Sequence, residues 1–308
     1  MGLSHGHSHG MPASAGMVHR RRLVTVLAMT SVVMVVQVIG GLVTDSLALL
    51  ADAGHMLTDV AGILLALIAV SFAARPATPE RTFGYYRVEI LAAVVNAVLL
   101  IVVATFIFIQ AWQRWSDPPK VDGGLMLVFA LIGLVANIVG LFVLRRGAQE
   151  SLNVRGAYLE VLGDTFGSAA VIVAAVLIAV TDWTRVDVIA SVVVALLILP
   201  RTWSLLREAI DVLLEATPRG VDMDEVRRHI LEVDGVLDAH DLHVWTITSG
   251  LPVLSVHVVV DDSTLNDQGG ARVLDRLGQC LGEHFDVEHC TFQLEPIGHV
   301  DHEVHVHH

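Results

Sequence analysis

Charged residues are scarce over most of this 308-residue chain. Hydrophobic residues make up 54% of the sequence and charged residues 17%, a composition too apolar for an ordinary soluble domain. The first 220 residues carry 15 Lys and Arg against 15 Asp and Glu, whereas residues 221–308 carry 4 against 17. The net charge of −13 therefore belongs to the last part of the chain. This division predicts a neutral membrane domain followed by an acidic soluble domain.

Cysteine is nearly absent, since Cys280 and Cys290 are the only two, and both lie in the acidic part. If that part lies in the reducing cytoplasm, structural disulfides are excluded as its main support. We expect two small buried thiols.

Six apolar stretches are long enough to cross a membrane as helices when windows of about 19 residues are used. They cover residues 23–43, 46–74, 88–112, 122–144, 154–180 and 186–206. Pro200 interrupts the last of them. With the N-terminus inside, eleven arginines gather on the cytoplasmic side, against Arg114, Lys120 and Arg185 outside. This bias predicts that both termini lie in the cytoplasm. The eleven are Arg20, Arg21, Arg22, Arg75, Arg81, Arg87, Arg145, Arg146, Arg155, Arg201 and Arg207.

Ionisable residues interrupt two of these apolar stretches in matched pairs. His55 and Asp59 lie in the second stretch, and Glu160 and Asp164 lie in the fifth, each pair spaced i, i+4 on one helical face. Burying such groups in hydrocarbon is costly, so they usually mark an ion pathway or a binding site. Four N and O ligands suit a tetrahedral divalent metal such as zinc. His55 is the only one of 16 histidines inside an apolar stretch.

Other polar residues extend these two stripes. Asp52 continues the stripe of His55 and Asp59, and Asn153 continues the stripe of the fifth stretch. Gly163 and Gly167 have the spacing of a small-x-x-x-small face, which lets helices approach closely. The alternative interpretation is hydrogen-bonding between helices, as we expect for Asn96 and Asn137. Three carboxylates near one another argue against that alternative, because like charges need a cation or protons to coexist.

Three segments together resemble the cation diffusion facilitator family of zinc transporters. Residues 45–59, with His55-Met-Leu-Thr-Asp59, resemble the family's second-helix signature, and residues 153–164 resemble its fifth-helix signature. His240-Asp-Leu-His-Val-Trp245 resembles the start of its cytoplasmic domain. The resemblance extends from about residue 20 to residue 296. It implies six transmembrane helices, a metal site from the second and fifth, a homodimer, and exchange of metal for protons.

Glu160 departs from the commoner family pattern, which has His-x-x-x-Asp on the fifth helix. The variant resembles the CzcD-like branch, whose members export cobalt and cadmium as well as zinc. A site of one imidazole and three carboxylates is harder and more anionic than a site with two histidines, so we do not expect strict selectivity for zinc. Arg87 and Glu215 fall at positions that resemble the family's ionic lock. The alternative for them is two interfacial charges that face water.

The acidic part predicts a small α+β domain. Helices are expected at 223–232 and 268–285, and strands at 236–248, 253–261 and 290–295, with a turn at 249–252. The order αββαβ suits a ferredoxin-like layer. Leu254, Val256, Val258 and Val260 alternate toward a core, with His257 on the other face. The family resemblance implies that His257 forms a cytoplasmic metal site with His240 and Glu295; simple exposure is the alternative.

The expected organisation has five parts. They are an N-terminal tail with histidines (1–22), a transmembrane domain (23–212), a linker (213–220), a cytoplasmic metallochaperone-like domain (221–298) and a histidine-rich C-terminal tail (299–308). The tails hold His5, His7, His9 and a second group from His299 to His308. Their spacing carries no fixed geometry, so we expect weak metal capture at most.

These observations predict a proton-coupled exporter of zinc, cobalt and cadmium in a bacterial inner membrane. We expect no prosthetic group and no nucleic-acid partner. An intramembrane metalloenzyme is disfavoured because no His-Glu-x-x-His motif occurs in any apolar stretch. A membrane-anchored metal sensor or storage protein is the remaining alternative, and it leaves the ligands inside the membrane unexplained.

Overall fold

The computed structural model describes residues 13–73, 75–145, 152–248, 250–265, 269–285 and 289–302. The chain divides into two compact units. One comprises Met1–Leu65 and Val95–Ser204, and the other comprises Ala66–Val94 and Leu205–His308. The predicted tail histidines before residue 13 and after residue 302 lie outside the described residues.

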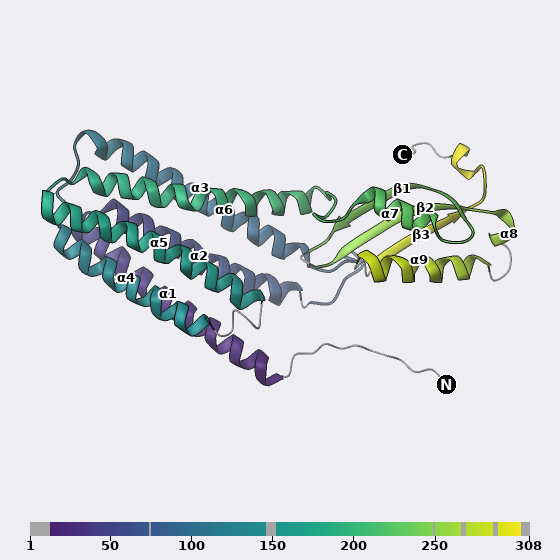
Figure 1. Cartoon of the computed structure of the whole chain (residues 1–308), viewed down its shortest axis with the longest axis horizontal. Helices are drawn as coiled ribbons and strands as arrows, with labels where there is room; N and C mark the ends of the chain where they lie inside the picture. Colours follow the sequence, from purple (N-terminus) through teal and green to yellow (C-terminus); the bar gives the residue numbers. More distant parts are fainter. Residues whose placement is uncertain are drawn as a thin grey trace. The chain divides into compact units, whose positions relative to one another are not determined.

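Six long helices come first in the chain, and each contains a segment long and apolar enough to cross a membrane (Figure 1). This confirms the six predicted spans. The helices are α1 (Ala13–Thr44), α2 (Leu47–Ala73), α3 (Arg87–Ser116), α4 (Gly123–Leu144), α5 (Leu152–Thr181) and α6 (Arg185–Leu213). Helices α3 and α6 extend beyond their predicted apolar segments by four and seven residues (from 112 to Ser116 and from 206 to Leu213). A hydropathy window detects only the apolar part of a helix, and the backbone continues further. Pro118 follows the end of α3, and Glu215, with a left-handed φ of 57°, follows the end of α6.

The predicted interruption at Pro200 is wrong, because α6 continues through it. A proline removes one backbone donor from the helical ladder, and membrane helices tolerate this where nearby groups satisfy the freed carbonyls. The carbonyl that loses its donor is that of Leu196, and the Thr202 hydroxyl donates at 3.0 Å to the carbonyl of Ile198, two residues further along the helix. Helix α6 therefore presents residues on both sides of Pro200 as one element.

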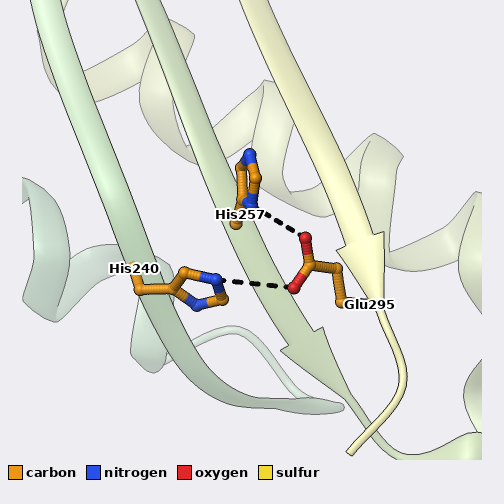
Figure 2. Close-up of side chains that lie close together, drawn as sticks. All are labelled: His240, His257 and Glu295. Carbon is orange, nitrogen blue, oxygen red and sulfur yellow. Dashed lines mark ion pairs between the residues drawn. The ribbon is translucent and has the colours of Figure 1, made fainter. Parts of the chain in front are cut away.

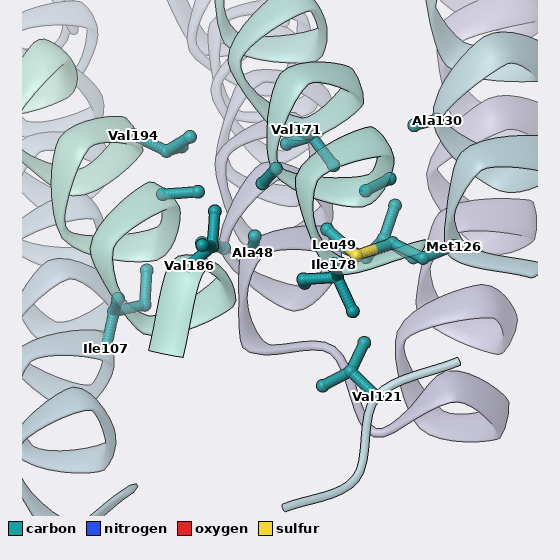
Figure 3. Packing of buried hydrophobic residues seen from close by; sticks show 14 of the residues in the cluster. Ala48, Leu49, Ile107, Val121, Met126, Ala130, Val171, Ile178, Val186 and Val194 are labelled. Carbon is teal, nitrogen blue, oxygen red and sulfur yellow. The ribbon is translucent and has the colours of Figure 1, made fainter. Parts of the chain in front are cut away.

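The core of the helical unit combines small and aliphatic side chains from α2 to α6 (Figure 3). Helix α4 packs against α5 and α1. At Gly123 the approach is backbone to backbone, because a Cβ there would lie 2.6 Å from the amide nitrogen of Ala179. Large apolar side chains such as Leu42, Phe142 and Val180 remain more than half exposed. This pattern suits helices whose outer faces contact lipid.

Asp187 near the start of α6 binds the N-terminus of α2. Its carboxylate accepts hydrogen bonds from the Ser46 hydroxyl at 2.5 Å and from the amide nitrogens of Leu47 and Ala48 at 2.7 and 3.1 Å. The first amides of a helix have no partner within the helix, and a carboxylate there also interacts favourably with the helix dipole. The start of α2 is thus fixed by a residue from α6.

The second unit contains the predicted α+β domain. Its elements are α7 (Met223–Leu231), β1 (Val236–Thr246), β2 (Pro252–Val260), the one-turn helix α8 (Asp262–Leu265), α9 (Gly269–Phe285), β3 (His289–Glu295) and the short 3₁₀ helix η2 (His299–His302). The sheet order is β1-β2-β3, with β2 antiparallel to β1 and parallel to β3. The order αββαβ is confirmed, and α8 is an addition. Helix α8 begins directly after Asp261, whose side chain accepts a hydrogen bond from the amide nitrogen of Ser263 at 2.8 Å. Such a local bond favours a turn.

Alternation along β2 gives the domain its core. Leu254, Val256, Val258 and Val260 are fully buried, as predicted, and pack with residues of α7 and α9. Cys280 and Cys290 form no disulfide, and both are of intermediate exposure, so the expectation of two buried thiols is wrong. Partial burial raises the pKa of Cys290. The other face of β2 carries His257.

Candidate metal sites

Three of the four predicted membrane ligands meet between α2 and α5. His55 Nε2 lies 3.1 Å from Asp164 Oδ1 and 3.6 Å from Asp59 Oδ2. One ligand atom from each of these three residues lies within 4.8 Å of the other two. A single ion bound at about 2.0–2.2 Å from each atom fits that spacing. The i, i+4 spacing on α2 and the packing of α5 therefore bring together one imidazole and two carboxylates.

Two atoms of this cluster have unused bonding capacity. His55 Nδ1 and Asp59 Oδ2 are buried and have no hydrogen-bond partner within the part of the chain that the structure describes. A buried polar atom without a partner is costly, and such atoms usually serve a ligand or a proton. Asp59 Oδ2 therefore has the chemistry of an oxygen donor for a cation.

Glu160, the fourth predicted ligand, does not join His55, Asp59 and Asp164. Its Oε1 atom pairs with Arg201 Nη2 of α6 at 3.2 Å, and the two side chains are 30% and 61% exposed. Glu160 is therefore part of an ion pair at the edge of the cluster. The sequence pattern predicted the helical face of Glu160 but not its partner. Arg201 could have been noticed as a charged residue that directly follows Pro200 within a predicted span.

Asp52 continues the α2 stripe into a buried polar layer and is 2% exposed. Gln37 of α1 and Ser168 of α5 lie within hydrogen-bonding reach of it. Asn137 of α4 donates to the Ser168 hydroxyl at 3.2 Å, which agrees with its predicted role between helices. These polar groups connect α1, α2, α4 and α5 beside the cluster.

The predicted glycine face is only half correct. A Cβ at Gly167 would lie 3.3 Å from Asp52 Oδ1, so α2 and α5 do approach closely there. A Cβ at Gly163 would meet nothing within 4 Å, because this residue faces outward. The Asn153 side chain lies outside the described side chains.

A second donor set lies on the sheet of the C-terminal domain (Figure 2). His240 of β1 pairs directly with His257 of β2 across the antiparallel ladder. Glu295, at the end of β3, points its carboxylate between them: Oε1 lies 2.8 Å from His257 Nδ1, and Oε2 lies 3.4 Å from His240 Nε2. Ligand atoms of all three residues lie within 4.8 Å of one another. The three predicted residues therefore come together.

Burial distinguishes this set from a surface cluster. Glu295 and His240 are buried, and Glu295 Oε2 has no hydrogen-bond partner among the described residues. Gln293 donates from Nε2 to Glu295 Oε1 at 2.7 Å and so orients the carboxylate. Two imidazoles and one carboxylate form the donor set of many zinc sites that leave one coordination position open. The residues present therefore fit a divalent metal.

Two contacts involve the first turn of α3, within the second unit. Arg87 Nη2 lies 2.7 Å from Glu215 Oε1, so the predicted ionic lock residues do form a pair. Thr248 donates to Glu89 Oε2 at 2.8 Å, a contact that the sequence did not predict. Both contacts hold the start of α3 to residues that follow α6 in the chain.

Two protein families match the chain. Residues 23–214 match the cation efflux transmembrane domain, and residues 218–297 match the cation efflux protein cytoplasmic domain. The metal cation efflux system protein CzcD of Cupriavidus metallidurans is 46% identical over 290 residues, covering 94% of this chain and 90% of that protein. Zinc transporter ZitB of Escherichia coli is 42% identical over 295 residues, covering 95% and 93%.

Two further proteins are similar. The cadmium, cobalt and zinc/H(+)-K(+) antiporter of Bacillus subtilis is 40% identical over 296 residues, covering 96% of this chain and 93% of that protein. The solved metal-bound C-terminal domain of the CzcD transporter is 44% identical, covers 24% of this chain and 99% of that structure, and has a TM-score of 0.23. The two family matches and the full-length relatives lead to one conclusion: this chain is a multi-pass membrane protein of the cation efflux family.

Proposed function

We propose that this protein exports zinc, and also cobalt and cadmium, from the cytoplasm in exchange for protons. The family shows cation efflux, and the relatives are named for these metals. The observation that carries the proposal is the cluster of His55, Asp59 and Asp164 inside the helical unit. An imidazole and two carboxylates buried between two membrane helices need a cation or protons.

The geometry supports proton coupling through the metal ligands themselves. His55 Nε2 faces Asp164 at hydrogen-bonding distance, so this nitrogen carries a proton when it donates to the carboxylate. The same nitrogen must lose that proton before it can bind a metal. Metal and proton therefore compete for one atom. We propose that Glu160 supplies the fourth ligand of the loaded site.

We further propose that the protein works as a homodimer with a regulatory metal site in each cytoplasmic domain. His240, His257 and Glu295 would hold zinc there, and the metal would supply a fixed cross-link between three strands. The ion pair of Arg87 with Glu215 connects the start of α3 to the segment that precedes this domain, which supports transmission of metal binding to α3. We place both termini in the cytoplasm of a bacterium and assign the histidine tails weak metal capture.

Flux measurements in reconstituted vesicles test the transport proposal. An imposed pH gradient should drive zinc across the membrane for the wild type. Asp164→Ala should reduce this flux at least about tenfold, because it removes a carboxylate oxygen that would bind the ion. Asp117→Ala, which removes an exposed carboxylate between α3 and α4, is the matched control.

Each outcome is informative. Zinc movement by Asp164→Ala at the wild-type rate would refute the membrane site. Zinc binding by the wild type without any flux would favour the rival function of a membrane-anchored sensor or storage protein.

A further inference from the structure

The ion pair between Glu160 and Arg201 separates one predicted ligand from the cluster. Glu160 lies one helical turn before Asp164 on α5, on the same face. Arg201 comes from α6, directly after Pro200. Glu160 Oε1 and Arg201 Nη2 are 3.2 Å apart, while Asp164 Oδ1 contacts His55. Two neighbouring carboxylates of α5 thus have different partners.

The position of Glu160 allows both partners in turn. Side chains at i and i+4 have Cβ atoms about 5–6 Å apart, and a glutamate has three rotatable bonds. A change of rotamer therefore carries the carboxylate from Arg201 toward Asp164 without moving the backbone. Glu160 is one turn from Asp164 along α5, so its ion pair with Arg201 lies beside the cluster.

Resting on the function proposed above, we propose that Arg201 is a positioning residue that holds Glu160 out of the cluster until a divalent cation arrives. The guanidinium acts as a substitute cation for this one carboxylate. When the metal binds His55, Asp59 and Asp164, Glu160 leaves Arg201 and becomes the fourth ligand. Arg201 therefore lowers the affinity of the site and assists release of the ion.

The exposure of the pair fits an exchangeable contact. Glu160 is 30% and Arg201 61% exposed, and Arg201 is one of the arginines predicted on the cytoplasmic side, so we expect water to screen the pair and its contribution to be small. A weak pair can be broken by a divalent ion that forms a direct bond to the carboxylate. An exposed pair of this kind changes a binding constant by about two- to fivefold.

Cobalt titrations of the purified full-length protein test this role, because the visible spectrum of cobalt reports its coordination. All proteins carry His257→Ala, so that the cytoplasmic donor set is disabled. Arg201→Gln should bind cobalt about two- to fivefold more tightly. In a protein that also carries Glu160→Gln, removing Arg201 should have less than half of that effect, because there is no carboxylate to release.

Two further variants keep the experiment decisive. Arg219→Gln is the matched control, since Arg219 is 60% exposed and pairs at 2.9 Å with Glu208, and neither residue belongs to the cluster. It should leave cobalt binding unchanged. Arg201→Met repeats the test with an apolar stem if Arg201→Gln does not fold.

The outcomes separate the two proposals. Equal gains from removing Arg201 with and without Glu160 would overturn its positioning role, because the effect would then be a general change of charge. No gain at all would overturn it as well. An Asp164→Ala protein that binds cobalt like the wild type would instead refute the transport site itself.

Discussion

At the scale of single residues, the chemistry of the membrane site depends on how many carboxylates face His55. Asp59 and Asp164 lie beside its Nε2 atom, and Glu160 lies beside Arg201. Each carboxylate adds hardness and negative charge to the set of ligands. The identity of residue 160 should therefore affect selectivity more than it affects transport as such.

Replacing Glu160 by histidine tests this expectation. A Glu160→His protein should still transport zinc, because imidazole is a good zinc ligand, and should lose cobalt and cadmium flux by about tenfold relative to zinc. Its dependence on pH should also change, since a neutral imidazole that gains a proton becomes a cation, whereas a carboxylate becomes neutral. Flux ratios for the three metals between pH 6 and pH 8 measure both effects.

Glu160→Gln is the control for this substitution, because it removes the charge and keeps the shape. Unchanged metal ratios and an unchanged pH profile in Glu160→His would mean that Glu160 never binds the ion.

Residue patterns predicted which faces meet but not which side chains pair. The i, i+4 spacing placed His55 and Asp59 together on one face of α2, because helix geometry fixes the faces. The same spacing on α5 did not decide the outcome, since Asp164 meets His55 while Glu160 pairs with Arg201. The partner of Glu160 comes from α6. Local periodicity does not predict a contact between two residues on different helices that are 41 positions apart in the sequence. The same limit applies to Gly163, whose spacing matches Gly167 although it faces outward.

At the scale of elements, the N-terminus of α2 depends on one side chain from another helix. Asp187→Asn should lower the stability of the protein by about 1–3 kcal/mol, because an amide cannot accept as many hydrogen bonds and carries no charge for the helix dipole. Thermal unfolding in detergent measures this change. We expect zinc flux to fall as well, since His55 and Asp59 are carried by the same helix.

Asp182→Asn is the matched control for Asp187→Asn. Asp182 follows α5, is exposed, and has a φ of 52°, which asparagine also tolerates. Equal stability of the Asp187→Asn protein and the control would show that α2 does not need this cap.

Helices and strands were predictable where the apolar residues are continuous or strongly periodic. The six spans follow from long apolar stretches, and the order αββαβ follows from the apolar period of the C-terminal domain. Pro200 misled the prediction, because its cost depends on how neighbouring groups satisfy the freed carbonyl, which a sequence window does not contain. The one-turn helix α8 is too short to show any period.

At the scale of the whole molecule, we propose that zinc bound by the cytoplasmic donor set changes how the two subunits of the dimer are arranged. Zinc should shorten the distance between the two cytoplasmic domains of the dimer, measured between spin labels on each subunit. His257→Ala should reduce this response strongly, because it removes one of three donors. The coupling can be no larger than the difference in zinc affinity between the two arrangements.

His243→Ala is the control for that measurement, since His243 is an exposed histidine of the same strand as His240. A zinc response of the same size in His257→Ala and in the control would count against a regulatory role of this site.

Helix α6 holds both ligand-bearing helices without supplying a proposed ligand itself. Asp187 near its beginning binds the start of α2, and Arg201 beyond Pro200 binds Glu160 of α5. A small rotation of this single helix would therefore change the environment of the ion from two directions. Variants selected for altered metal tolerance should accordingly include substitutions in α6 that lie several residues away from every ligand.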